Sequence, residues 1–147
     1  MNKTDGDIEV VCSNKLLLDT HILVWYAEGI KLSKLQVEVI EKARKDSNLF
    51  ISHISIWEIV MLVNKGRVSF SLPIQEWIDK LLSIEGFSIA ELTTSILIES
   101  CQLPNYEHKD PVDRMIIATA RCCNAVLMTA DQKILDYGTI GYVKVSS

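Results

Sequence analysis

Short apolar stretches alternate with helical patterns along most of this chain, and that alternation restricts the fold more than any other feature. Stretches rich in Leu, Ile, Val, Phe and Met predict strands at residues 15–18, 49–51, 87–92, 125–128 and 140–145. Apolar residues at helical spacing predict helices at residues 20–28, 33–45, 54–65, 73–85, 94–102, 110–123 and 132–137. This order predicts a single α/β/α sandwich with a five-stranded, mainly parallel sheet.

Local signals at the predicted helix ends support these bounds. Ser33 and Gln36 have the spacing of a capping box, in which each side chain binds the other residue's backbone N–H. Asp110 precedes Pro111 in the order preferred at the start of a helix. Gly138 marks the predicted end of the last helix, because glycine commonly follows a helix C-terminus.

Length and composition indicate one domain. The chain has 147 residues, of which 48% are hydrophobic, enough for a substantial core. Residues 1–14 are polar and acidic except for residues 8–11 (IEVV), which could form a short strand. We therefore expect an N-terminal extension over 1–14 and one domain over 15–147. No stretch approaches the roughly 20 apolar residues of a membrane span, and a secretory signal is not apparent, so we expect a cytoplasmic protein.

Charge and cysteine usage exclude two classes of site. The net charge of −4 argues against a protein that binds nucleic acid with its whole surface, because such binding depends on neutralising phosphates; a local basic rim remains compatible. The four cysteines form no C-x-x-C pair and have no histidine at metal-site spacing. This pattern argues against a zinc site and predicts buried free thiols.

Four carboxylates lie against apolar residues rather than on polar faces. Asp19 and Asp131 follow predicted strands, whereas Glu58 and Asp113 lie in predicted helices made of Ile, Val, Trp, Met and Ala. Burying an ionised carboxylate costs several kcal/mol unless it is paired or binds a cation. If the first and fourth strands flanked a reversal of strand order, Asp19 and Asp131 would face each other there, where such sheets bind ligands.

Each of these acids also has a purely structural explanation. Asp19 and Asp131 could cap the helices that follow them, and Asp113 could be stabilised by the positive N-terminus of its helix. The segment 55–58 matches a capping box, but the apolar periodicity indicates that the helix is already running at Glu58, which makes this alternative the weakest. These explanations do not account for four such acids in one small domain. Oxygen ligands favour Mg²⁺ or Mn²⁺, and phosphodiester hydrolysis is the natural use of such a site.

Other conspicuous side chains carry less functional signal. The three histidines have no cysteine or serine partner at a recognisable spacing, so we expect structural or surface roles. Trp25, Trp57 and Trp77 stand at helical core positions and are interpreted as packing residues. The apolar residues from 54 to 63 exceed what one helix face needs, which predicts self-association.

Four segments, taken together, resemble the PIN-domain ribonucleases, specifically the VapC-type toxins of prokaryotic toxin–antitoxin pairs. Residues 15–21 (KLLLDTH) resemble the family's opening strand with its first metal-binding acid, and residues 51–58 (ISHISIWE) resemble the segment that carries the second. Residues 108–118 resemble the stretch with the third acid, Asp113, and residues 127–131 (LMTAD) resemble the strand that ends in the fourth.

The resemblance implies a specific fold, activity and site. The sheet order would be 3-2-1-4-5, and the protein would be a Mg²⁺-dependent endoribonuclease, a homodimer, and the target of a cognate antitoxin. Asp19, Glu58, Asp113 and Asp131 would hold the metal, with Mn²⁺ as a substitute. Thr20 and Asp110 would support them, and Arg114 would contact RNA or antitoxin.

Two other functions compete with this one. A PIN-like module could retain the acids for stability or antitoxin docking and bind RNA or protein with little nuclease activity. A small Mg²⁺-dependent phosphatase would instead need a second Asp two positions after Asp19, where the chain has His21.

Overall fold

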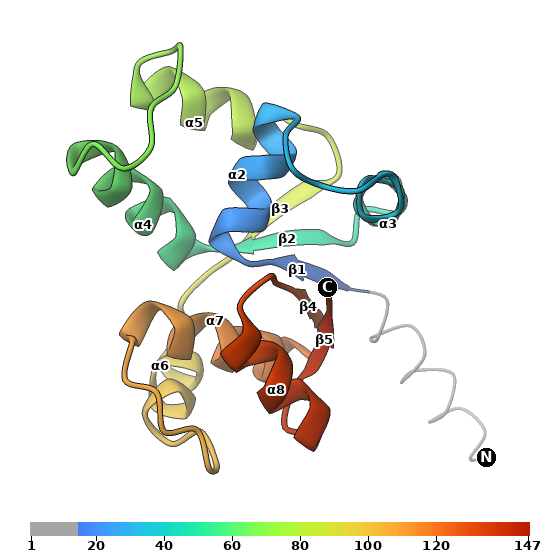
Figure 1. Ribbon diagram of the computed structural model, residues 1–147, viewed down its shortest axis with the longest axis vertical. Helices are drawn as coiled ribbons and strands as arrows, with labels where there is room; N and C mark the ends of the chain where they lie inside the picture. The colour runs from blue at the N-terminus through green and yellow to red at the C-terminus, as the bar shows by residue number, and fades with distance from the viewer. Residues whose placement is uncertain (1–14) are drawn as a thin grey trace.

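The computed structural model describes residues 15–147 as an α/β/α sandwich around a five-stranded sheet (Figure 1). The predicted extension over residues 1–14 lies outside the described residues. The strands are β1 (Leu16–Leu18), β2 (Leu49–Ser52), β3 (Phe87–Ala90), β4 (Val126–Met128) and β5 (Lys144–Ser146). The helices are α2 (Thr20–Glu28), α3 (Lys34–Lys45), α4 (His53–Asn64), α5 (Ile74–Leu82), α6 (Thr94–Cys101), α7 (Pro111–Cys123) and α8 (Gln132–Ile140).

The strand order is 3-2-1-4-5, as predicted, and every neighbouring pair is parallel. Strand β1 is central, with Leu17 paired to Phe50 on one side and to Leu127 on the other. All three β1 residues are buried, because helices cover both faces of a parallel sheet. The order reverses between β1 and β4, so the chain segments that leave these two strands diverge at one point.

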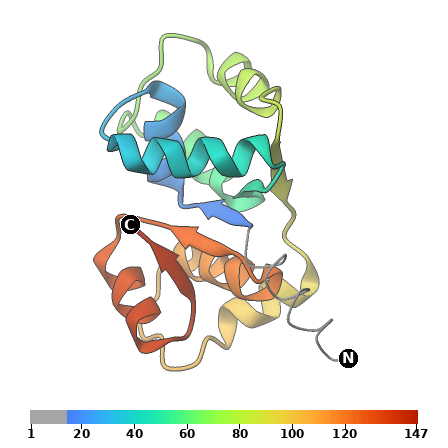
Figure 2. The same cartoon turned by 90° about the vertical axis from the view of Figure 1, so that its right-hand side faces the viewer.

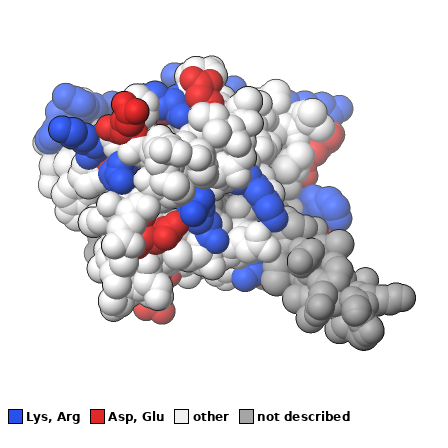
Figure 3. All heavy atoms as spheres, turned by 90° about the horizontal axis from the view of Figure 1, so that it is seen from below, with Lys and Arg blue, Asp and Glu red and all other residues white. Residues whose placement is uncertain are grey.

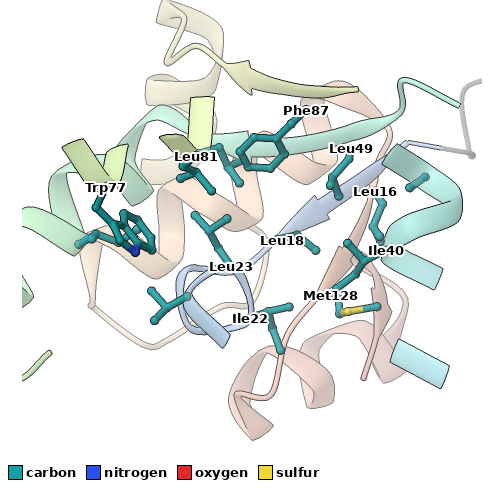
Figure 4. Packing of buried hydrophobic residues seen from close by; sticks show 14 residues of the cluster. Leu16, Leu18, Ile22, Leu23, Ile40, Leu49, Trp77, Leu81, Phe87 and Met128 are labelled. Atoms are coloured by element: carbon teal, nitrogen blue, oxygen red, sulfur yellow. The ribbon is translucent and has the colours of Figure 1, made fainter. Parts of the chain in front are cut away.

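Two apolar cores lie on opposite faces of the sheet. Leu16 and Leu18 pack with α2, α3, α4 and α5, whereas Leu17 packs with α6, α7 and α8. Figures 1 and 2 show these two helix layers on either side of the strands. Figure 4 shows the first core, where Leu23, Leu81 and other aliphatic side chains gather above β1 and β2. Successive leucines of β1 thus pack into the two opposite cores. The same strand leads directly to Asp19.

Local capping signals predicted several helix ends correctly. Ser33 and Gln36 form the predicted capping box at the start of α3, with each side chain accepting from the other residue's backbone N–H. Asp110 caps α7 and Pro111 is its first residue, as predicted. Helix α4 begins at His53 with Ser52 as its cap, so the alternative that residues 55–58 form a capping box is wrong.

The end of the last helix differs from the prediction. Helix α8 continues through Gly138 to Ile140 and ends at Gly141, which has a left-handed φ of 107°. Gly138 serves close packing instead, since a Cβ there would lie 2.3 Å from Val145 Cγ2 on β5. The final strand is correspondingly shorter than the predicted 140–145 and begins at Lys144.

The tryptophans have different environments. Trp77 is buried, stacks on Phe70 with ring centroids 4.1 Å apart, and donates from Nε1 to Glu28 Oε2 at 3.0 Å. The packing role predicted for Trp57 is wrong, because its side chain is 54% exposed. Ser55 and Ile59 are the buried residues of α4, and Trp57 lies two positions from each, so it points to nearly the opposite side of the helix.

The surface carries mixed charge where Figure 3 views it. Basic and acidic side chains are interspersed there among uncharged ones rather than gathered into one patch. Cys101 and Cys122 are exposed, so the prediction of buried thiols is wrong for these two; Cys12 lies outside the described residues. Among residues 15–147, no helix combines the length and apolar character that crossing a membrane requires.

Candidate functional site

The four predicted acids line one cavity at the carboxyl ends of β1 and β4, where the strand order reverses. The cavity has a volume of about 420 Å³. Asp19 and Asp131 enter it directly after the strands, Glu58 comes from α4, and Asp113 comes from the first turn of α7. The remaining lining residues are His21, Trp25, Asp110, Ala130 and Lys133. The fold therefore brings together residues separated by more than a hundred positions.

Asp19 is the most deeply buried of these carboxylates, with 8% of its surface exposed. Its Oδ1 accepts from the Thr20 backbone N–H at 2.8 Å, which makes it the N-cap of α2. Its backbone N–H donates to the Met128 carbonyl at 2.9 Å, so the residue is tied to β4 as well as to its own strand. Capping was one of the two roles the sequence left open for Asp19, and the structure shows that this role and the cavity position coexist.

Thr129 connects the two strand-end acids. Its fully buried hydroxyl donates to Asp19 Oδ2 at 2.6 Å and accepts from the Asp131 backbone N–H at 3.0 Å. Asp131 in turn caps α8 by accepting from the Lys133 N–H at 2.9 Å. Thr129 was not among the site residues predicted from the sequence. Its position between a buried strand and Asp131 could have indicated it, since a hydroxyl there can bind both neighbouring loops.

A pair of buried hydroxyl groups joins α2 to α4. Thr20 Oγ1 and Ser55 Oγ lie 2.9 Å apart and both are buried. Ser55 precedes Glu58 by three residues, so the two side chains lie on the same face of α4. The pair therefore joins the helix that carries Glu58 to the helix that Asp19 caps. Thr20 was predicted to support the acids, and this bond is consistent with that role.

Asp110 fixes the start of the helix that carries Asp113. Its Oδ1 accepts from the Val112 N–H at 2.9 Å and from the Asp113 N–H at 3.4 Å. The Asp113 side chain is half-buried and projects from the first turn of α7, where the helix dipole favours negative charge. Asp110 also lines the cavity itself, so its position fits either a supporting or a direct role.

The carboxylates are unfavourable neighbours for one another. Burial and, after it, the charges of Asp110, Asp19 and Asp131 together raise the pKa of Asp113 to about 7. Burial also raises the pKa of Asp19, against the opposing effect of the hydrogen bonds from Thr129 and Thr20. For Glu58, burial raises the pKa, the Thr20 hydroxyl lowers it, and the Asp19 charge raises it. The cavity thus concentrates negative charge that a cation would neutralise.

The donor set fits a hard divalent cation. The lining offers the oxygens of five carboxylates and the imidazole nitrogen of His21, and it contains no cysteine. Among residues 15–147, no three His, Cys, Asp or Glu side chains are already close enough together to hold an ion.

The cavity also has a basic and aromatic rim. His21 and Trp25 come from α2, with ring centroids 6.2 Å apart, and Lys133 comes from α8 on the other face of the sheet. The packing role predicted for Trp25 is incomplete, because the ring packs partly against the core and also lines the cavity. His21 and Trp25 are four residues apart on the helix that Asp19 caps, so they share one helix face. This spacing is the sequence signal that predicts the rim.

Arg114 lies in a different environment from the acids. Its guanidinium donates to the carbonyl oxygens of Ser100 at 2.8 Å, Tyr106 at 3.0 Å and His108 at 2.8 Å, and it lies 5.6 Å from the centroid of the Tyr106 ring. These bonds hold the connection between α6 and α7. A contact with RNA or antitoxin stays a prediction, and the observed bonds favour a structural role.

This chain matches one known protein family and resembles a named relative. The model of the PIN domain matches residues 16–139. Ribonuclease VapC22 of Mycobacterium tuberculosis (strain ATCC 25618 / H37Rv) is 31% identical over 120 residues, which cover 81% of this chain and 88% of that protein.

Solved structures share the fold at lower identity. The crystal structure of VapBC2 from Rickettsia felis, bound to a DNA fragment from its promoter, matches with a TM-score of 0.66 and 18% identity over 89% of this chain and 96% of that chain. DNA-bound VapBC from Salmonella typhimurium matches with a TM-score of 0.64 and 17% identity over 90% of this chain and 96% of that chain.

Proposed function

The chain belongs to the PIN domain family, and from this premise we propose that it is a metal-dependent endoribonuclease, a VapC-type toxin that a cognate antitoxin neutralises. The observation that carries the proposal is the single cavity lined by Asp19, Glu58, Asp113 and Asp131. The relative at 31% identity is named a ribonuclease, and the structural neighbours are VapBC complexes, which supports the same activity and partner here.

The proposed cofactor is Mg²⁺, with Mn²⁺ as a substitute, held by Asp19, Glu58, Asp113 and Asp131. When bound, such an ion activates a water for in-line attack on a phosphodiester and stabilises the leaving oxygen. The protein's own contribution is positional. Thr129 orients the Asp19 carboxylate and Asp110 holds the first turn of α7, so that carboxylates from four chain segments face one volume.

A cleavage assay tests this function directly. The wild-type chain is expected to cut RNA with Mg²⁺ or Mn²⁺ and to lose activity in chelator. Asp19→Asn and Asp113→Asn should abolish cleavage, whereas Glu38→Gln, an exposed acid on α3, should leave it unchanged. Cleavage that persists in chelator, or that survives both Asp variants, would overturn the proposal.

The alternative of a PIN-like binding module makes a different prediction for the same assay. A module that retains the acids for stability or antitoxin docking would bind RNA or a protein and cut RNA little or not at all, with or without metal. The gathering of Asp19, Glu58, Asp113 and Asp131 around one cavity favours the nuclease over acids kept only for stability, since like charges placed together destabilise the fold.

We also propose a homodimer and a cytoplasmic location. Trp57 on α4 and Ile98 on α6 are each 54% exposed, and both helices pack against α7. Large exposed apolar side chains on helices that pack against a common helix are typical of a protein–protein contact. Light scattering tests the dimer: Trp57→Glu should give a monomer, whereas Leu35→Glu on α3 should not. A wild-type monomer across the micromolar range would contradict it.

A further inference from the structure

The Tyr106 hydroxyl is a buried donor that has no acceptor. Tyr106 lies in the connection between α6 and α7, and 7% of its surface is exposed. Among residues 15–147, no group forms a hydrogen bond with its hydroxyl oxygen. A buried hydroxyl without a partner destabilises the folded state, because its hydrogen bonds to water are lost and none replaces them. The metal-free fold therefore gains no stability from this oxygen.

The ring that carries this hydroxyl is held between two helices of the site. It meets Tyr137 of α8 edge-on, with ring centroids 4.8 Å apart. The guanidinium of Arg114 on α7 lies 5.6 Å from the ring centroid, and it donates to the Tyr106 carbonyl at 3.0 Å. Helix α7 carries Asp113 in its first turn, and α8 is capped by Asp131. Tyr106 is therefore fixed beside the two helix starts that bring acids to the cavity.

Asp113 is the complementary case, a carboxylate that has no donor. The side chains of Asp19, Asp110 and Asp131 each accept at least one hydrogen bond, whereas that of Asp113 accepts none from the described residues. Its charge also acts on the tyrosine: burial and, after it, the charge of Asp113 raise the pKa of Tyr106 above its ordinary value. The phenol therefore keeps its proton and remains able to donate.

The hydroxyl lies behind the cavity wall rather than in the cavity. Asp113 lines the cavity and Tyr106 does not, and Tyr106 belongs to the same apolar core as Val112, the residue before Asp113. A substrate in the cavity therefore does not meet the hydroxyl. Carboxylates that bind a metal are held in turn by donors outside the metal's own ligands, and the loss of such a donor weakens metal binding.

We propose that Tyr106 is a positioning residue for Asp113, and that its hydroxyl donates a hydrogen bond to the Asp113 carboxylate when the site holds its divalent cation. This inference rests on the proposed metal site. The bond supplies each group with the partner that it lacks, as Thr129 already does for Asp19. The hydroxyl therefore increases the affinity for the cation, although it adds nothing to the stability of the metal-free protein.

Two tyrosines of one core allow a matched comparison. Tyr106→Phe removes the unpaired hydroxyl and keeps the ring. Tyr137→Phe removes a hydroxyl from an equally buried ring, but this hydroxyl already donates to the Pro104 carbonyl at 2.6 Å. Calorimetric titration of the full chain with Mn²⁺ measures the affinity for the cation, and thermal melts without metal measure the stability.

We expect the two variants to behave in opposite ways. Tyr106→Phe should weaken Mn²⁺ binding by roughly 10-fold and, without metal, should melt no lower than the wild type. Tyr137→Phe should melt several degrees lower, because the Pro104 carbonyl loses its donor, and should bind Mn²⁺ nearly as the wild type does. A crystal structure of the Mn²⁺-loaded wild type identifies the acceptor, and Tyr106 Oη should lie roughly 3 Å from an Asp113 carboxylate oxygen.

Three results would overturn the role of Tyr106 while the metal site stands. These are an unchanged Mn²⁺ affinity of Tyr106→Phe, a lower melting temperature of this variant without metal, and a hydroxyl that binds only Asp131 or a water in the loaded protein. A wild type that binds no Mn²⁺ contradicts the metal site and the Tyr106 bond together. A wild type that binds Mn²⁺ but cuts no RNA contradicts the nuclease function alone.

Discussion

The Thr129 hydroxyl donates a 2.6 Å hydrogen bond to Asp19 Oδ2 across 110 positions of sequence. Thr129 Oγ1 also accepts from the Asp131 backbone N–H, so one buried hydroxyl connects the two strand-end acids. The proposed function depends on carboxylates that face one cavity, and this bond helps to position two of them.

Removing that hydroxyl should affect both stability and metal binding. Thr129→Val keeps the shape but leaves a buried carboxylate oxygen without its donor, which costs about 1–3 kcal/mol of unfolding free energy. Loss of such a supporting bond also weakens metal affinity by roughly 10-fold to 100-fold. Denaturant unfolding and Mn²⁺ titration measure the two effects. Thr139→Val, which loses an exposed helix-surface hydroxyl, is the control, and equal behaviour of the two variants would contradict the role of Thr129.

The stability of the metal-free protein should fall as the pH rises from about 4 to 7. Asp113 has a pKa of about 7 in the folded state, against an ordinary value of 3.8. Between these values the unfolded chain releases the proton while the folded protein keeps it, so raising the pH favours unfolding until the folded carboxyl also ionises. The full shift corresponds to about 4 kcal/mol, and we expect about half because Asp113 is partly exposed to solvent.

Melting curves across this pH window check the effect. Asp113→Asn should melt with a shallower pH dependence than the wild type, and Glu38→Gln should follow the wild type. Saturating Mn²⁺ should remove much of the slope, since the ion replaces the proton. An identical slope in wild type and Asp113→Asn would show that another group is responsible.

Gly138 should resist substitution although it lies inside a helix. Alanine normally stabilises a helix interior by up to about 1 kcal/mol relative to glycine. Here the added Cβ would overlap Val145 Cγ2 at 2.3 Å, so Gly138→Ala should cost about 1–3 kcal/mol net. Adding Val145→Ala removes the overlapping methyl groups, and the double variant should recover part of the loss. A stabilised Gly138→Ala would disprove this packing.

Sequence reasoning succeeded where the determining interactions are local. The capping box of Ser33 and Gln36 and the pairing of Asp110 with Pro111 depend on residues within one turn, so the starts of α3 and α7 could be predicted. The strand order came from the family resemblance, and with it the expectation that Asp19 and Asp131 meet at the reversal.

It failed where distant segments decide the outcome. Gly138 appears to be a helix stop until β5 is placed against it, because the clash involves a residue of another element. Trp57 is a large apolar residue of the kind found in cores. However, α4 is apolar on more than one face, and only the packed fold decides which face meets the sheet. The Thr129–Asp19 bond and the Thr20–Ser55 pair join separate loops and have no local signature.

Arg114 should prove structural when its charge is removed. Arg114→Met keeps the apolar stem but loses the bonds to the carbonyls of Ser100, Tyr106 and His108, so we expect a loss of about 2–4 kcal/mol and faster proteolysis within residues 102–110. The RNA affinity of the folded fraction should be little changed. Unaltered stability together with weakened RNA or antitoxin binding would instead establish the contact that the family resemblance implies.

The central claim is that Asp19, Glu58, Asp113 and Asp131 form one metal site, and calorimetric titration with Mn²⁺ tests it most directly. We predict measurable binding heat for the wild type and for Glu38→Gln, and binding weakened by at least about 10-fold when Asp19 or Asp113 is changed to Asn. Absence of heat in the folded wild type, or undiminished binding in both Asp variants, would contradict the account.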